Sequence, residues 1–71
     1  MSAIDRARWL LENVTAKAQA RDDEAAHSEE DALHMHALAR ISEPDCTIEE
    51  ARELAVIALS TKDLDFCRWC A

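Results

Sequence analysis

The chain contains no glycine and only one proline, Pro44, among its 71 residues. Tight turns often need a residue with positive φ, and glycine adopts that conformation at the least cost. Without glycine, such turns would have to use Asn, Asp or Ser, and a fold built on β-hairpins is disfavoured. Alanine, leucine, glutamate and arginine are abundant, and all four are good helix formers. The sequence therefore predicts an all-α fold.

The length of the chain limits it to a single helical domain, residues 1–71, with a small core. One core of this size rarely supplies more than about 3–5 kcal/mol of stability. Hydrophobic residues make up 49% of the sequence, but much of that fraction is alanine. The larger apolar side chains suffice for a small bundle of three helices plus a short C-terminal helix or turn. Self-association would add stability to so small a core.

Four pairs of residues match the capping-box pattern, in which a Ser or Thr is followed three residues later by an acid. They are Ser2 with Asp5, Ser28 with Asp31, Thr47 with Glu50, and Ser60 with Asp63. We expect a helix to begin at each of them. The alternative for the first two is one long helix over residues 3–41. The clearest loop is the segment 42–46, because its proline disfavours helix at the preceding residue.

The helix expected over about residues 48–60 is apolar nearly all round between Leu54 and Leu59. Such a helix is usually the central one, covered by its neighbours. The segment from Lys62 to Ala71 is expected to fold back over the bundle as a lid. Trp9 lies almost opposite the apolar stripe of the first helix. We expect the C-terminal segment to cover it, with Trp69 in contact, or else Trp9 to be an exposed anchor for a partner.

The chain has a net charge of −7, from fifteen acidic and eight basic side chains. Binding to a phosphate backbone needs clustered Lys and Arg, and here the basic residues are scattered, so direct nucleic-acid binding is disfavoured. No apolar run approaches the roughly 18 residues that suggest a membrane span, and the signal-peptide pattern is missing. Three cysteines, an odd number, favour reduced thiols. We therefore expect a cytoplasmic protein without membrane attachment.

Six acids lie within ten residues, between positions 22 and 31. Within this segment, Glu24, His27 and Asp31 have the spacing that places side chains on one helical face. The simplest interpretation is a solvated charged face. The functional alternative is an acidic patch that docks the basic surface of another protein. A more specific form of this alternative is that the patch mimics nucleic acid. The residues predicted to contact a partner are Trp9, Asp22, Asp23, Glu24, His27, Glu29, Glu30, Asp31 and Trp69.

Cysteine and histidine suggest a different class, a small zinc-binding structural domain. Cys67 and Cys70 form a Cys-x-x-Cys pair, and Cys46 with His34 would complete four ligands. His36 cannot join His34 on one ion, because side chains two positions apart on a helix point about 200° apart. The simpler interpretation is that the cysteines are small buried apolar residues and that no cofactor is bound. No nucleophile and base form a recognisable catalytic motif, so we expect no enzymatic activity.

The tail Asp-Leu-Asp-Phe-Cys-Arg-Trp-Cys-Ala, residues 63–71, resembles the ending of small acidic proteins encoded by bacteriophages, notably those of actinobacteria. The segment Asp-Asp-Glu-Ala-Ala-His-Ser-Glu-Glu-Asp, residues 22–31, is also similar to these proteins. The resemblance implies a phage-encoded protein in the host cytoplasm and no catalytic activity. Together with the charge, it leads us to predict a small acidic protein-interaction module that binds and modulates a host or phage protein.

Overall fold

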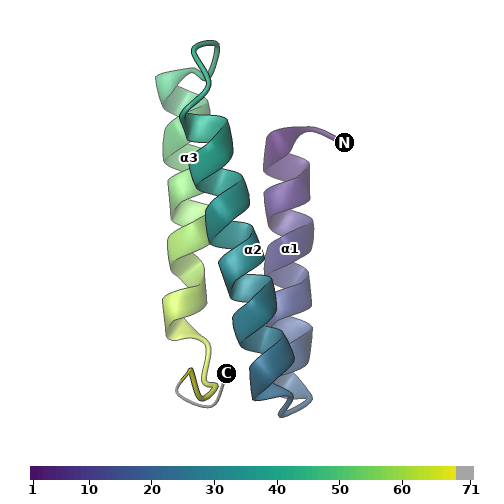
Figure 1. The fold of residues 1–71 in the computed structure, drawn as a ribbon. Coiled ribbons are helices and arrows are strands. Elements are labelled where there is room, and N and C mark those ends of the chain that lie inside the picture. Colours follow the sequence, from purple (N-terminus) through teal and green to yellow (C-terminus); the bar gives the residue numbers. More distant parts are fainter. Residues whose placement is uncertain (69–71) are drawn as a thin grey trace.

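The computed structural model describes residues 1–68, which form an all-α bundle of three helices (Figure 1). The helices are α1 (Ala3–Gln19), α2 (Asp23–Ile41) and α3 (Ile48–Leu59), and a short 3₁₀ helix, η1 (Ser60–Asp63), follows α3. Short connections make consecutive helices antiparallel. The predicted fold class, three helices plus a short C-terminal element, is confirmed.

Two of the four predicted helix starts are confirmed. The side chain of Ser2 accepts a hydrogen bond from the amide of Asp5 at 3.0 Å, at the start of α1. Thr47 accepts one from the amide of Glu50 at 3.1 Å, at the start of α3. Each bond satisfies one of the free amides at a helix N-terminus. The predicted loop at 42–46 is also confirmed, because it separates α2 from α3.

The other two predicted caps are not formed. Ser28 lies inside α2, because that helix already begins after Asp22, whose side chain accepts a hydrogen bond from the Ala25 amide at 3.2 Å. The short helix η1 does begin at Ser60, but the Ser60 side chain does not cap it. Its hydroxyl donates to the carbonyl oxygen of Ile57 at 2.6 Å, and the chain continues from α3 directly into η1.

A short turn, residues 20–22, separates α1 from α2 and rules out the alternative of one long helix through both. Arg21 has φ = 62°, in the left-handed region. Its amide donates to Ala18 O at 3.1 Å, and the amide of Asp22 donates to Lys17 O at 3.0 Å. This is the Schellman pattern, which usually places glycine in the left-handed position. The expectation that Asn, Asp or Ser would take such positions is wrong here, since an arginine does so.

The core has two parts, built from different elements. Where the three helices meet, its buried members are Ala7, Leu10, Leu33, Ala37, Leu54 and Ile57. Near the α1–α2 turn, the segment after η1 takes the place of α3, and its Phe66 packs with Val14, Ala18 and Ala26. The predicted lid is therefore present as far as Arg68. Buried alanines let α1 and α2 lie close together, and this pair makes the most extensive helix contact of the bundle.

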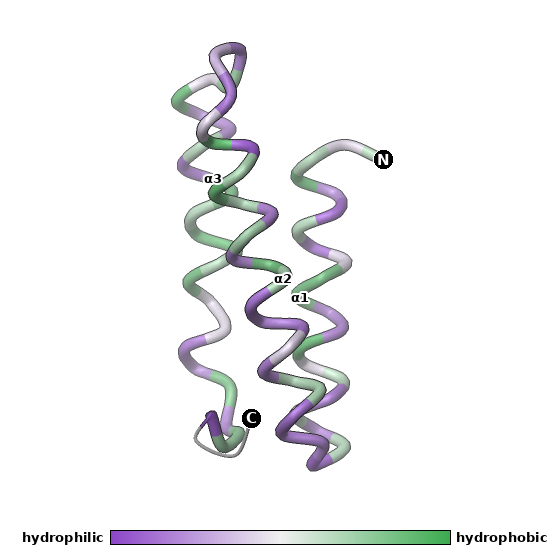
Figure 2. The backbone as a smooth tube through the Cα atoms, in the orientation of Figure 1, coloured by the Kyte–Doolittle hydropathy of each residue, from purple (hydrophilic) through white to green (hydrophobic). Residues whose placement is uncertain are grey.

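The expectation that α3 would be covered on all sides is wrong. Leu54 and Ile57 are buried, but Ile48, Val56 and Leu59 are exposed. α3 packs on the other two helices through one face only, and Figure 2 shows green, hydrophobic residues along much of its length. Despite this apolar character, none of the described helices is both long and apolar enough to cross a membrane.

The loop end of the α2–α3 pair extends beyond the start of α1 (Figure 1). The offset agrees with the contact of His36 on α2, whose Nε2 lies 2.8 Å from the carbonyl oxygen of Ala3, the first residue of α1. Past this level, Arg40 joins α2 to α3 through two hydrogen bonds to Glu50, at 3.0 and 2.8 Å. Arg40 also pairs with two acids of the loop, Glu43 at 3.1 Å and Asp45 at 2.9 Å.

Candidate functional site

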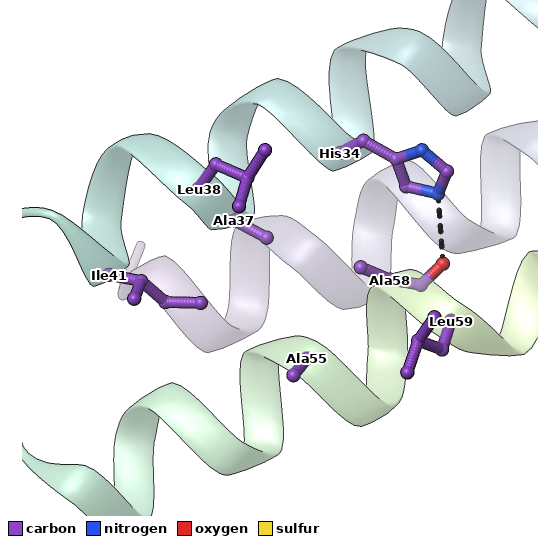
Figure 3. Close-up of a pocket in the computed structure, with 7 residues that line it drawn as sticks. All are labelled: His34, Ala37, Leu38, Ile41, Ala55, Ala58 and Leu59. Atoms are coloured by element: carbon purple, nitrogen blue, oxygen red, sulfur yellow. Dashed lines mark hydrogen bonds between the residues drawn. The ribbon is translucent and has the colours of Figure 1, made fainter.

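An apolar groove runs between α2 and α3, with α1 behind it (Figure 3). Its volume is about 340 Å³. Apart from one histidine, the side chains that line it are apolar: His34, Ala37, Leu38 and Ile41 from α2, and Ala55, Ala58 and Leu59 from α3. We call this feature the α2–α3 groove.

The leucines of the groove differ sharply from the leucines of the core. Leu38 and Leu59 keep 64% and 63% of their surface exposed, whereas Leu33 and Leu54 are completely buried. Single exposed apolar residues are ordinary on protein surfaces, but apolar residues gathered around one hollow mark binding sites. The α2–α3 groove therefore has the character of a contact surface.

His34 supplies the polar group of the groove. Its Nε2 lies 3.0 Å from the carbonyl oxygen of Ala58, a bond drawn in Figure 3, and 3.4 Å from the hydroxyl oxygen of Thr61. Because a carbonyl only accepts, Nε2 carries the proton of the bond to Ala58. His34 is therefore a hydrogen-bonded histidine on an apolar face. His36 bonds to α1 instead, so the two rings point to different helices, as predicted.

The acidic segment begins at the end of the bundle where the α1–α2 turn meets the segment after η1. Asp22 and Glu24 are exposed there, and Asp23 is half-buried. Asp65, which was not among the predicted contact residues, lies beside them, because it lines the same polar hollow of about 370 Å³ as Asp23 and Arg21. We call Asp22, Asp23, Glu24 and Asp65 the acidic end.

Glu30 does not belong to an exposed acidic surface, which corrects its predicted role. Only 6% of its surface is exposed, and Arg68 binds both of its carboxylate oxygens. Burial raises the pKa of Glu30, but hydrogen bonds from Arg68 and Thr61 and the charge of Arg68 outweigh it, and the pKa falls below its usual value. Glu30 is therefore a structural ion-pair residue.

The other predicted contact residues of α2 remain at or near the surface. Asp31 is exposed and lies 3.6 Å from Nε2 of His27, as the spacing predicted for one helical face. Glu29 is half-buried. These three residues therefore extend the acidic surface along α2, away from the acidic end.

Trp9 is not covered by the described part of the C-terminal segment. It is 45% exposed, and the guanidinium of Arg6 lies 5.7 Å from its ring centroid. The expectation that the tail would bury Trp9 is therefore wrong for the residues described. Trp9 is exposed, as the alternative requires, and its role as an anchor for a partner stays a prediction. Trp69, the second predicted anchor, lies outside the described residues.

The structure does not bring together the three described residues of the zinc alternative, Cys46, Cys67 and His34. Cys46 lies just before α3, and Cys67 follows η1 at the other end of that helix, so at least 18 Å or so of helix separates them. Zinc needs its ligands within about 2.3 Å. His34 lies between the two and is bonded to α3, and Cys70 lies outside the described residues. Within residues 1–68 no group of three or more candidate ligands is placed to hold a metal.

Arg40 and its partners Glu43, Asp45 and Glu50 form a group that we call the Arg40 cluster. The thiol of Cys46 lies next to this cluster. It donates to the carbonyl oxygen of Thr47, with Sγ and O 3.6 Å apart. Burial and the negative charge of Glu50 raise the pKa of Cys46, and Arg40 only partly opposes this. A raised pKa disfavours the thiolate, which is the form that binds metals and attacks electrophiles.

Sequence reasoning did not identify the groove, although its signal was present. Leu38 and Ile41 lie three positions apart, the spacing of one helical face, and the apolar run of the third helix exceeds what one buried face can hold. Apolar residues in excess of a single stripe indicate a second apolar surface.

Comparison of the chain with protein-family models, with curated proteins and with solved structures finds no match.

Proposed function

We propose that the chain is a small acidic protein-interaction module that binds a basic protein and modulates it. The observation that carries the proposal is the state of its carboxylates. Nine of the fifteen acidic side chains of the sequence make no ion pair with a described residue. They are Asp5, Glu12, Asp22, Asp23, Glu24, Glu29, Glu49, Asp63 and Asp65.

Unpaired surface carboxylates favour a partner of opposite charge for a physical reason. They attract a basic surface over distances of about a Debye length and so raise the rate of encounter. They add little to the stability of a small bundle, since their mutual repulsion opposes compaction. The acidic end offers the densest group, because two segments distant in the sequence bring Asp23 and Asp65 to one hollow.

The identity of the partner class rests on the resemblance of the tail and of residues 22–31 to small acidic phage proteins. On that basis the partner is a host or phage protein in an actinobacterial cytoplasm. A small module can inhibit such a protein by occupying the surface that normally contacts nucleic acid or another subunit, because that surface is basic.

The test is an affinity capture from an actinobacterial lysate, uninfected and infected, read by quantitative mass spectrometry. The acidic-end variant Asp23→Asn/Glu24→Gln/Asp65→Asn removes three charges. The matched variant Asp5→Asn/Glu12→Gln/Glu49→Gln removes the same number elsewhere, and none of these six residues makes an ion pair with a described residue. We expect one stoichiometric partner that the acidic-end variant loses and the matched variant keeps.

Ionic strength provides a second arm. A complex held by charge should release its partner as salt rises from about 0.1 to 1 M, because the Debye length shrinks from about 10 to 3 Å. If neither lysate yields a partner above a tag-only control, the proposal is wrong. A partner retained equally by both variants would likewise overturn the role of the acidic end.

A further inference from the structure

We infer that the α2–α3 groove receives one amphipathic helix of the partner, with apolar side chains on the bound face and Lys or Arg on its flanks. This inference rests on the proposed function and specifies the segment that the partner presents. Helix-in-groove binding of this kind uses apolar anchors at positions i, i+3 or i+4, and i+7.

The shape of the groove suits a helix. Its floor is formed by the short side chains of Ala37, Ala55 and Ala58, so the axis of an incoming helix can lie close to α2 and α3. Leu38 and Leu59 stand on either side as walls, from α2 and α3 respectively (Figure 3). Because the two leucines lie at different positions along the groove, an incoming helix would meet an apolar wall first on one side and then on the other.

The length of the groove sets the number of anchors. From His34 to Ile41 the lining extends over seven residue-to-residue steps of α2, roughly 10.5 Å at 1.5 Å per step. Two turns of an incoming helix cover the same distance, which is the separation of positions i and i+7. The volume of about 340 Å³ lies at the lower end of the roughly 300–1,000 Å³ usual for binding pockets. It therefore fits a short apolar face.

Charge decides between a partner helix and a second copy of the chain. Two copies would bring together two molecules that each carry a net charge of −7, and repulsion would oppose the contact. Beyond the Ile41 end of the groove, Arg40 pairs with Glu43, Asp45 and Glu50, and this cluster retains two negative charges. At the His34 end, the groove adjoins a second hollow that shares His34, Ala58 and Leu59 and is also lined by the cation Lys62. A basic helix therefore matches the charge of the Ile41 end.

The probe is a displayed library of random peptides about 16 residues long, near the minimum for a helix in water. Selection is carried out on the full chain, and the dissociation constants of enriched peptides are measured by fluorescence anisotropy. The groove variant is Leu38→Gln/Leu59→Gln. The matched variant is Met35→Gln/Val56→Gln, which changes two apolar residues that are equally exposed but do not line the groove.

We expect enriched peptides to combine apolar residues at i, i+3 or i+4, and i+7 with Lys or Arg elsewhere. They should bind the groove variant at least about tenfold more weakly, which corresponds to roughly 1.4 kcal/mol, and bind the matched variant like the wild type. Circular dichroism of both variants checks that the fold is retained. Enrichment without this pattern, or equal affinity for the groove variant, would overturn the inference.

Two further outcomes are distinguishable. A dimer in sedimentation analysis that the groove variant abolishes would show that a second copy fills the groove, and the inference would be wrong. A lysate partner that the acidic-end variant loses but the groove variant keeps at full affinity would retain the proposed function while overturning the groove inference. Peptide selection with the expected pattern but no lysate partner would support the groove and contradict the proposed function.

Discussion

Arg68 and Glu30, 38 positions apart in the sequence, form two hydrogen bonds, from Nε to Oε1 at 3.0 Å and from Nη2 to Oε2 at 2.9 Å. Arg68 also donates to the carbonyl oxygen of Thr61 at 2.9 Å, and its guanidinium lies 3.9 Å from the centroid of the Phe66 ring. This pair ties the segment after η1 to α2 and holds Phe66 in the core.

Replacing Arg68 should destabilise the bundle, because Glu30 would remain buried without its partner. Breaking a fully buried pair costs about 3–5 kcal/mol, but the Arg68 side chain is 36% exposed, so we expect Arg68→Ala to lower the free energy of unfolding by about 2 kcal/mol. Urea denaturation measures the loss. The double variant Glu30→Gln/Arg68→Ala should lose less than the sum of the single variants, and strict additivity would contradict the pairing.

Stability should fall in acid. The pKa of Glu30 is lowered in the folded chain from its usual 4.5, so its contribution is present above 4.5 and is lost as the pH falls through the folded-state pKa. The pKa of Glu50 is also lowered, because Arg40 donates hydrogen bonds to its carboxylate. Protonation of Glu50 in acid should therefore lower the stability further. We expect the urea midpoint of the wild type to drop more steeply below about pH 4.5 than that of Glu30→Gln. Parallel curves would contradict the assignment to Glu30.

Glycine at position 21 should stabilise the protein. Arg21 holds the left-handed conformation with φ = 62°, which costs a residue with a Cβ about 1–2 kcal/mol, partly offset by the greater freedom of glycine in the unfolded chain. We expect Arg21→Gly to gain about 0.5–1 kcal/mol and to raise Tm by roughly 2–8 °C in calorimetry. Arg21→Ala keeps the steric cost and serves as the control. A glycine variant no more stable than the alanine variant would rule out strain at this turn.

The Arg40 cluster should slow the hydrogen exchange of backbone amides in the loop between α2 and α3. Lysine at this position keeps the charge but cannot bond both oxygens of Glu50 while also reaching Glu43 and Asp45. We expect Arg40→Lys to speed hydrogen exchange of residues 42–47, measured by mass spectrometry, while amides in the middle of α1 are unchanged. Arg52→Lys, an exposed arginine with no ion pair to a described residue, is the control.

Leucines of the core and of the groove should respond differently to truncation. Leu54 is completely buried, so Leu54→Ala should cost about 2–5 kcal/mol of unfolding free energy. Leu38 is mostly exposed, so Leu38→Ala should change stability by less than about 0.5 kcal/mol. Urea denaturation of both variants compares them directly. A large loss at Leu38 would show that it supports the fold instead of a contact surface.

Features that depend on nearby residues could be predicted from the sequence. The caps at Ser2 and Thr47 are examples, because the acceptor and donor lie three positions apart. The loop at 42–46 follows from its proline. The opposite directions of His34 and His36 follow from helical geometry alone.

Features that depend on residues distant in the sequence could not be predicted. Helical spacing from Leu33 places Glu30 on the core face, but the sequence around Glu30 does not show which residue would pair with a buried carboxylate there. A buried carboxylate is stable at this position because the chain after η1 folds back and places Arg68 beside it. The turn at Arg21 was missed for a related reason, since its backbone hydrogen bonds, not its side chain, compensate an unfavourable φ.

The extension of the α2–α3 pair beyond α1 gives the groove a direction. Beyond the Ile41 end, α2 and α3 continue past the start of α1 and are joined there by the Arg40 cluster. At the opposite end, His34 is fixed to Ala58 with all three helices present. The groove therefore ends in an ionic cluster on one side and in a hydrogen-bonded histidine on the other, so its two ends offer different contacts to a ligand.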